Sequence, residues 1–206
     1  MGEVISYVAR MIPAQGLNKK ALPDQNKIKQ YLFQEEYKQL VLLRQLPTFK
    51  HESVSLLYPG CGADILFPMF YLKQLFPQLK KAQLTMIDQY HPADMIKTVL
   101  DDLGISFTEE NQTIHFYWKK TLMTVFFLED DIFKIIDRLP AFDVYFERAF
   151  RIMKDGHPKY ERKIVEKLVS GGLVVSDSGF QGVPLTYYPV PSQLSAYGEM
   201  VLGVKE

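Results

Sequence analysis

The sequence predicts an α/β fold with a doubly wound, mainly parallel sheet of about seven strands and helices on both faces. Short apolar runs alternate with longer segments whose apolar residues recur at helical spacing, which is typical of successive βαβ units. A glycine-containing turn joins the first apolar run to the helix that follows it. The last two apolar runs have no clear helix between them, so we expect the final strand to be antiparallel to the rest.

The N-terminal part of the chain predicts a helical extension. Apolar residues recur at helical spacing between Asn26 and Leu46, and Pro47 ends this helix. We therefore divide the chain into an N-terminal helical extension, residues 1–49, and an α/β domain, residues 50–206. Two roles are open for the extension: it covers the functional site as a lid, or it only docks on the sheet.

The first strand–turn–helix unit follows directly. Residues 54–58 predict a short buried strand, and residues 59–64 predict a tight turn. A helix then runs to about Phe76 and is ended by Pro77. Pro68 fits this helix only in its first turn, where its missing N–H has no partner to lose.

The remaining elements complete the alternation. Two β-rich runs around residues 119–121 predict a hairpin, and two further runs predict the closing strands. In chain order the expected elements are strand 82–87, helix 92–103, strands 113–118 and 122–128, helix 131–138, strand 142–146, helix 157–169, strand 172–176 and strands 187–190 and 199–204.

Composition and charge favour an ordinary globular domain. The chain has 206 residues, of which 47% are hydrophobic, and its 24 Lys and Arg balance 24 Asp and Glu. That length fits one domain with a small addition. A nucleic-acid-binding protein usually carries a basic excess or a basic stripe. We therefore expect no nucleic acid partner.

Several other classes are disfavoured. The single cysteine, Cys61, excludes a disulfide within the chain and a cysteine-based zinc site. The four histidines lie far apart in sequence, so we expect no metal. No apolar run approaches the roughly 20 residues of a membrane span, and the N-terminus lacks a signal-peptide pattern. We expect a cytoplasmic protein without a membrane partner. The sequence does not indicate its oligomeric state.

The turn after the first strand is the predicted ligand-binding site. In a doubly wound sheet, ligands bind beyond the carboxyl ends of the strands, and glycines such as Gly60 and Gly62 let backbone approach a ligand closely. Asp88 ends the second strand, where a carboxylate accepts hydrogen bonds from ribose hydroxyls. The alternative is that the glycines only form a tight turn and that Asp88 only caps a helix, without a ligand. We favour the site because turn and acid occur together at the expected separation. Ile65 stands where a dinucleotide fingerprint needs glycine, and no P-loop is present.

With this strand, glycine turn and acid, the sequence resembles the class I S-adenosylmethionine-dependent methyltransferase family. Residues 56–64 resemble its glycine-rich first motif, and Asp88 resembles its ribose-binding acid. Residues 129–131 follow the next strand, where the family often places an acid near the adenine amino group. Residues 142–146 and 168–177 resemble its fourth and fifth strands. The resemblance covers roughly residues 50–206 and implies a Rossmann-like methyltransferase fold.

The resemblance implies S-adenosylmethionine as the cofactor. Carried over residue by residue, it gives the following cofactor-binding candidates: Tyr58, Gly60, Cys61, Gly62, Asp64, Asp88, Asp130, Asp131 and Glu147. Two of them depart from the family pattern, since Tyr58 replaces an acid and Asp64 replaces a glycine. Asp64 either takes over from the missing acid, which helps hold the methionine end of the cofactor, or caps the following helix; we favour the cap.

Catalytic residues are not evident from the sequence. Glu147 is a candidate base or a binder of a cationic acceptor, and Arg148 is a candidate binder of an anionic one. The alternative is that these two residues pair with each other or with solvent. Cys61 as a nucleophile is disfavoured, because a small residue is simply convenient in a glycine turn. The acceptor is expected between residues 147–150 and residues 177–180.

These observations predict an S-adenosylmethionine-dependent methyltransferase that acts on a small-molecule acceptor. The neutral charge favours this class of acceptor. The family resemblance adds that the absence of an Asn/Asp-Pro-Pro-aromatic run after the fourth strand argues against adenine or glutamine side-chain acceptors. One alternative is a methyltransferase-like domain that binds a nucleoside or a partner without catalysis, and Tyr58 favours it. A second alternative is a purely structural or interaction module.

Overall fold

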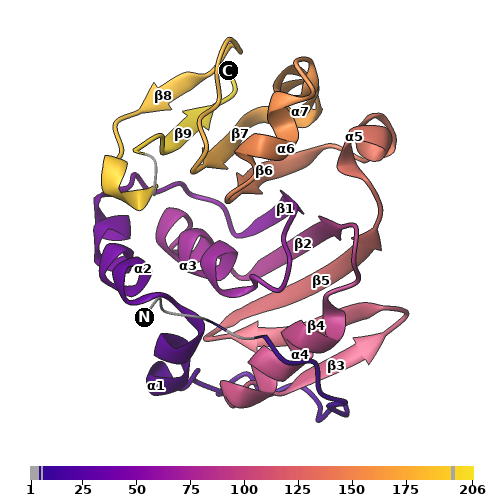
Figure 1. Cartoon of the computed structure of the whole chain (residues 1–206). Helices are drawn as coiled ribbons and strands as arrows, with labels where there is room; N and C mark the ends of the chain where they lie inside the picture. Colours follow the sequence, from indigo (N-terminus) through magenta and orange to yellow (C-terminus); the bar gives the residue numbers. More distant parts are fainter. Residues whose placement is uncertain (1–4, 6, 196–197) are drawn as a thin grey trace.

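A computed structural model describes residues 5, 7–195 and 198–206 of the chain (Figure 1). These residues form one nine-stranded sheet in the order β3-β4-β5-β2-β1-β6-β7-β9-β8. The strands are β1 (Ser53–Pro59), β2 (Lys81–Asp88), β3 (Phe107–Glu110), β4 (Thr113–Trp118), β5 (Thr121–Glu129), β6 (Phe142–Glu147), β7 (Leu168–Ser176), β8 (Thr186–Tyr188) and β9 (Val201–Val204).

The centre of the sheet is parallel and doubly wound. Strands β5, β2, β1, β6 and β7 are neighbours in this order, and each pair among them is parallel. The chain builds outward from β1 to β2 and β5, then returns to the other side of β1 for β6 and β7. The predicted fold class is confirmed for this part. Strand β9 is antiparallel to β7 and β8, as we expected for the last strand.

The prediction of about seven strands is wrong, because the sheet has nine. The hairpin of β4 and β5 was predicted, but β3 at the edge of the sheet was not. Strand β3 has only four residues, two of them glutamates, and it pairs with β4 through a two-residue turn. Asn111 and Gln112 in this turn have φ of 49° and 62°. Glutamine rarely adopts such a conformation, so the sequence carried no hairpin signal there.

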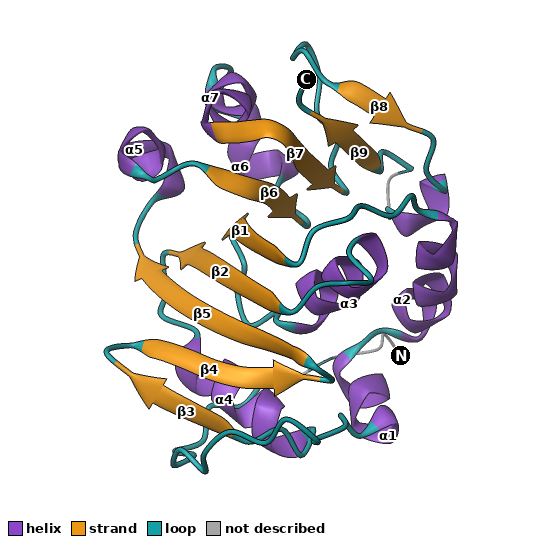
Figure 2. Cartoon of the chain, turned by 180° about the vertical axis from the view of Figure 1, so that it is seen from behind, coloured by secondary structure: helices purple, strands orange, loops and turns teal. Residues whose placement is uncertain are grey.

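Helices cover the two faces of the sheet unevenly (Figures 1 and 2). Side chains alternate along each strand, so Leu56 and Tyr58 of β1 join one core and Leu57 joins the other. The first core also contains residues of α3 and α4, and the second contains residues of α5 and α7. The helices are α1 (Gln25–Ile28), α2 (Gln34–Gln39), α3 (Leu66–Leu75), α4 (Ala93–Asp102), α5 (Ile132–Ile135), α6 (Arg151–Asp155) and α7 (Tyr160–Lys167).

The single helix expected from Asn26 to Leu46 is wrong. The segment contains α1, a 3-10 turn, α2 and a second 3-10 segment, and the break falls at Leu32 and Phe33, which are extended. Ile28, Leu32, Leu43 and Leu46 all belong to the first core, together with α3. The apolar residues of this segment recur at the spacing of one straight helix. Packing of their side chains against α3 nevertheless breaks the segment into shorter helices. Residues 1–4 and 6 of the predicted extension lie outside the described residues.

None of the helices that the structure describes is long and apolar enough to span a membrane.

Candidate functional site

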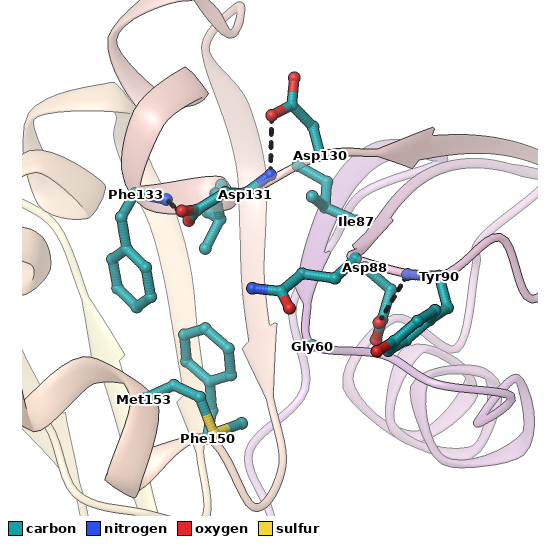
Figure 3. A pocket seen from close by; sticks show the side chains of 11 residues that line it. Gly60, Ile87, Asp88, Tyr90, Asp130, Asp131, Phe133, Phe150 and Met153 are labelled. Carbon is teal, nitrogen blue, oxygen red and sulfur yellow. Dashed lines mark hydrogen bonds between the residues drawn. The ribbon is translucent and has the colours of Figure 1, made fainter.

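A cleft lies at the carboxyl ends of β1, β2 and β5, beside the loop that follows β6 (Figure 3). Its volume is about 220 Å³. This is the side of a doubly wound sheet, next to the point where the strand order reverses, at which ligands bind. The lining of the cleft combines apolar side chains with three carboxylates. It comprises Gly60, Ile87, Asp88, Gln89, Tyr90, Asp130, Asp131, Ile132, Phe133, Phe150 and Met153.

The glycine turn is held against the end of β2. The Gly60 N–H donates to the Ile87 carbonyl at 2.8 Å, and the Gly62 N–H donates to Oδ2 of Asp88 at 2.8 Å. Both glycines have positive φ, 59° and 49°, a conformation that side chains rarely adopt. Gly60 therefore places backbone, without a side chain, at the floor of the cleft, whereas the predicted Gly62 does not line it.

The two glycines differ in what surrounds them, and this leads to a prediction. A Cβ at Gly60 would lie 2.6 Å from Cδ2 of Phe150, whereas a Cβ at Gly62 would meet nothing within 4 Å. We expect Gly62→Ala to lower the free energy of unfolding by about 1–2 kcal/mol, the cost of a left-handed residue. Gly60→Ala should cost clearly more, because the buried Phe150 ring must also move. Urea denaturation of both variants measures the difference, and equal losses would contradict the proposed contact.

Asp88 presents its carboxylate to the cleft at the end of β2 (Figure 3). Its Oδ2 accepts the Gly62 N–H, and its Oδ1 accepts the Tyr90 N–H at 3.2 Å. A carboxylate has about four lone-pair sites, so each oxygen retains a position for a hydroxyl donor. The backbone bonds fix the orientation of the group, which reduces the entropy lost when a ligand binds.

Asp130 and Asp131 line the cleft where the chain leaves β5 (Figure 3). Oδ1 of Asp130 accepts the Asp131 N–H at 2.7 Å. Asp131 caps α5 by accepting the Phe133 N–H at 3.0 Å, and its other oxygen pairs with Lys134. Both oxygens of Asp131 are thus engaged, whereas Oδ2 of Asp130 makes none of these contacts, and Asp130 is exposed. It can accept a hydrogen bond from an amino group in the cleft.

Two of the predicted cofactor residues, Tyr58 and Cys61, are buried beneath the cleft instead of lining it. Tyr58 is 2% exposed, and its ring makes an edge contact with Phe146 at a centroid distance of 4.9 Å. Cys61 is 3% exposed, and burial raises the pKa of its thiol well above the usual value. A neutral, buried thiol is a poor nucleophile. These positions shape the turn, and we do not keep them as ligand contacts.

Asp64 makes the helix contact that the sequence favoured and further contacts besides. Its Oδ1 accepts the Phe67 N–H at 3.1 Å in the first turn of α3. Its Oδ2 accepts the Tyr58 hydroxyl at 2.8 Å and pairs with Arg148 at 3.3 Å. Asp64 thus links the glycine turn to the loop after β6.

Arg148 is the centre of an ion cluster at the edge of the same turn. Its guanidinium pairs with Glu36 at 2.8 Å, and its Nε lies 4.0 Å from Asp177. Its central carbon lies 3.3 Å from the centroid of the Phe67 ring, a cation–π contact. The paired carboxylates keep the pKa of Arg148 raised despite its burial.

Glu147 does not line the cleft but lies at the end of β6, in a buried polar network with residues of α6 and β7. Its side chain is fully buried and receives hydrogen bonds from Tyr145, Ser176 and Ser178 at 2.5–2.8 Å. Its Oε1 also pairs with Lys154 at 2.6 Å. Both carboxylate oxygens are occupied. We therefore do not keep Glu147 as a base or a cofactor contact. Glu147 and Arg148 do not pair with each other, contrary to the simplest alternative.

Sequence reasoning missed several residues of the site. Tyr90 and Gln89 directly follow Asp88, so their place next to the acid was a signal that could have been used. Phe133 and Met153 gave no comparable signal. Glu36 lies in the N-terminal segment, far from Arg148 in sequence, and only the packing of α2 brings the two together. Among the described residues, no group of three His, Cys, Asp or Glu side chains is placed to hold a metal ion.

The fold and the cleft define a class: a doubly wound α/β protein with an open cleft at a glycine turn, at the carboxyl ends of its parallel strands. No protein-family model matches the chain, and no curated protein matches its sequence. Similar solved structures exist at low identity. TrmN from Thermus thermophilus matches over 82% of this chain and 48% of its own, with 13% identity and a TM-score of 0.46. MNMC2 from Aquifex aeolicus matches over 81% of this chain and 56% of its own, with 12% identity and a TM-score of 0.46.

A third similar structure carries a ligand. It is an S-adenosylmethionine-dependent methyltransferase from Thiobacillus denitrificans in complex with S-adenosylhomocysteine. It matches over 70% of this chain and 48% of its own, with 14% identity and a TM-score of 0.42. The chain thus spans about half the length of these three structures.

The expectation that nucleic acid is not a partner is contradicted. The similar structures of TrmN and MNMC2 count against it. The expectation rested on the balance of 24 basic and 24 acidic residues. That balance averages over the whole surface and does not describe the local potential around a site. We withdraw the exclusion of nucleic acid and the restriction to small-molecule acceptors.

Proposed function

We propose that the cleft binds the adenosine part of S-adenosylmethionine and that the chain is a methyltransferase. One observation carries this proposal: the Asp88 carboxylate faces the cleft beside the bare backbone of the Gly60 turn. A ribose offers two neighbouring hydroxyls, and a fixed carboxylate accepts both. The resemblance noted in the sequence supports the same cofactor.

The residues of the cleft fit the rest of an adenosine. Ile87, Ile132 and Phe133 provide apolar walls for a planar base, and Asp130 provides an acceptor for an exocyclic amino group. When bound, S-adenosylmethionine supplies a methyl group on a sulfonium, and the main task of the protein is to align the acceptor with it.

Binding is the direct test. Isothermal titration of the full chain with S-adenosylhomocysteine and with 5′-methylthioadenosine should show one site for each ligand. NAD⁺ serves as the control, because the turn lacks the third glycine of a dinucleotide site. Absence of binding by both adenosine ligands would refute the proposal, as would preferred binding of NAD⁺.

A domain that binds the ligand without catalysis is the second candidate. Tyr58 fills the position of the expected acid with a buried ring, and ion pairs already occupy the carboxylate of Asp64. Methyl transfer from labelled S-adenosylmethionine to a small-molecule pool and to RNA would distinguish the two. Labelled product in either pool supports an enzyme, whereas tight binding without transfer to either supports the binding domain.

A further inference from the structure

Arg148 is a cation placed beside the glycine turn, and the cofactor cleft does not use it. It precedes Phe150, a wall of the cleft, by two residues, and its partner Asp64 follows Gly62 by two residues. Two residues span roughly 7 Å, so both groups lie at the edge of the turn that forms the floor of the cleft. A ligand extending from the cleft across this turn would approach them.

The cluster around Arg148 contains charges of both signs. Glu36, Asp64 and Asp177 surround the single guanidinium, so carboxylates are in excess. Burial raises the pKa of Asp177 above its ordinary value. Tyr7 lies close enough for Asp64 and Glu36 to add to the effect of burial, and its pKa is raised to about 12. An α-amino acid zwitterion carries one carboxylate and one ammonium, which a guanidinium and a set of carboxylates can bind together.

Glu36 differs from the other two acids in its origin. It comes from α2 in the N-terminal segment, whereas Asp64 and Asp177 follow strands of the sheet. Its Oε1 pairs with Nη2 of Arg148 at 2.8 Å, and its Oε2 accepts the Phe33 N–H at 2.9 Å. The ion pair is partly exposed, with 24% and 23% of the side chains accessible. Because part of each side chain is accessible, another carboxylate can approach the guanidinium and take the place of Glu36.

We propose that Arg148 binds the carboxylate at the amino acid end of the cofactor and that Glu36 occupies this position when no ligand is bound. Glu36 is then an internal competitor, and the N-terminal segment regulates access to the site. The fixed stack of Arg148 on Phe67 keeps the guanidinium in place while its partner changes. This inference rests on the proposed function, because it assumes that the cleft binds the adenosine part of the same ligand.

Comparing the affinities of two ligands distinguishes binding of the amino acid end from binding of the adenosine part. S-adenosylhomocysteine carries the zwitterion, and 5′-methylthioadenosine lacks it. Glu36→Gln removes the competing charge and keeps the side chain's size, so affinity for S-adenosylhomocysteine should rise about tenfold, which corresponds to about 1.4 kcal/mol. Affinity for 5′-methylthioadenosine should stay the same. Glu35→Gln is the matched control, since Glu35 is the exposed neighbour that pairs with Lys38, and it should change neither affinity.

Arg148→Met should act in the opposite direction and lower affinity for S-adenosylhomocysteine at least tenfold, without an effect on 5′-methylthioadenosine. If this variant does not fold, Glu36→Gln alone decides. Suppose that Glu36→Gln binds each ligand but has the same ratio of the two affinities as the wild type. This result would overturn the inference and leave the proposed function intact. Absence of binding by both ligands in every variant would overturn the proposed function and the inference with it.

Discussion

Asp88→Asn is expected to weaken binding of S-adenosylhomocysteine at least tenfold. The carboxylate accepts hydrogen bonds from two ribose hydroxyls in the proposed complex, and each charge-assisted bond contributes roughly 1.5–3 kcal/mol. Asparagine has lost the charge and has only one acceptor oxygen. A loss of about 1.4 kcal/mol already corresponds to a tenfold change in affinity. Isothermal titration measures the effect directly.

Asparagine is preferred to alanine at this position because Asp88 also holds the turn. Its Oδ2 accepts the Gly62 N–H at 2.8 Å, and an amide oxygen can keep that bond. Thermal unfolding should therefore be affected less than in Asp88→Ala, since only the longer bond from the Tyr90 N–H, at 3.2 Å, is lost. Asp94→Asn in the first turn of α4 is the control, since Asp94 does not line the cleft and pairs with Lys97. Wild-type affinity in Asp88→Asn would exclude Asp88 as the ribose-binding residue.

The second large effect is on stability. Lys154→Met is expected to lower the free energy of unfolding by about 3–5 kcal/mol, the cost of leaving one partner of a buried ion pair without its counterion. The ammonium lies 2.6 Å from Glu147 and 2.9 Å from Glu161, and the Glu147 side chain is fully buried. Removing Lys154 leaves the Glu147 charge with only neutral hydroxyl donors from Tyr145, Ser176 and Ser178.

A lysine on the neighbouring helix provides the matched control. Lys163 pairs with Asp137 at 2.5 Å, but the two side chains are 35% and 66% exposed. Lys163→Met should cost no more than about 1 kcal/mol, because water screens an exposed pair. Urea denaturation of the two variants gives the comparison. Similar small losses would show that the Glu147 network is not the stabilising element that its burial indicates.

The local elements were predictable because their signals are local. Residues 54–58 were read as a strand and form the middle of β1, and Asp88 was placed at the end of β2, where it lies. Such runs show their pattern over a few residues, and glycine and proline mark their ends. The antiparallel last strand followed from the missing helix before it. Strand β3 was missed because four mostly polar residues and a Gln112 turn give no such pattern.

The sequence by itself determined the parallel core of the sheet and the juxtaposition of the Gly60 turn with Asp88, since strands that run in parallel bring their carboxyl ends to one edge. Only the tertiary structure decided which side chains face the cleft. Tyr58 and Cys61 stand in the turn motif, yet both are buried in the first core, where alternation along β1 points Tyr58 the same way as Leu56. Glu36 reaches Arg148 because packing of the N-terminal segment on the sheet, which no local pattern encodes, places them side by side.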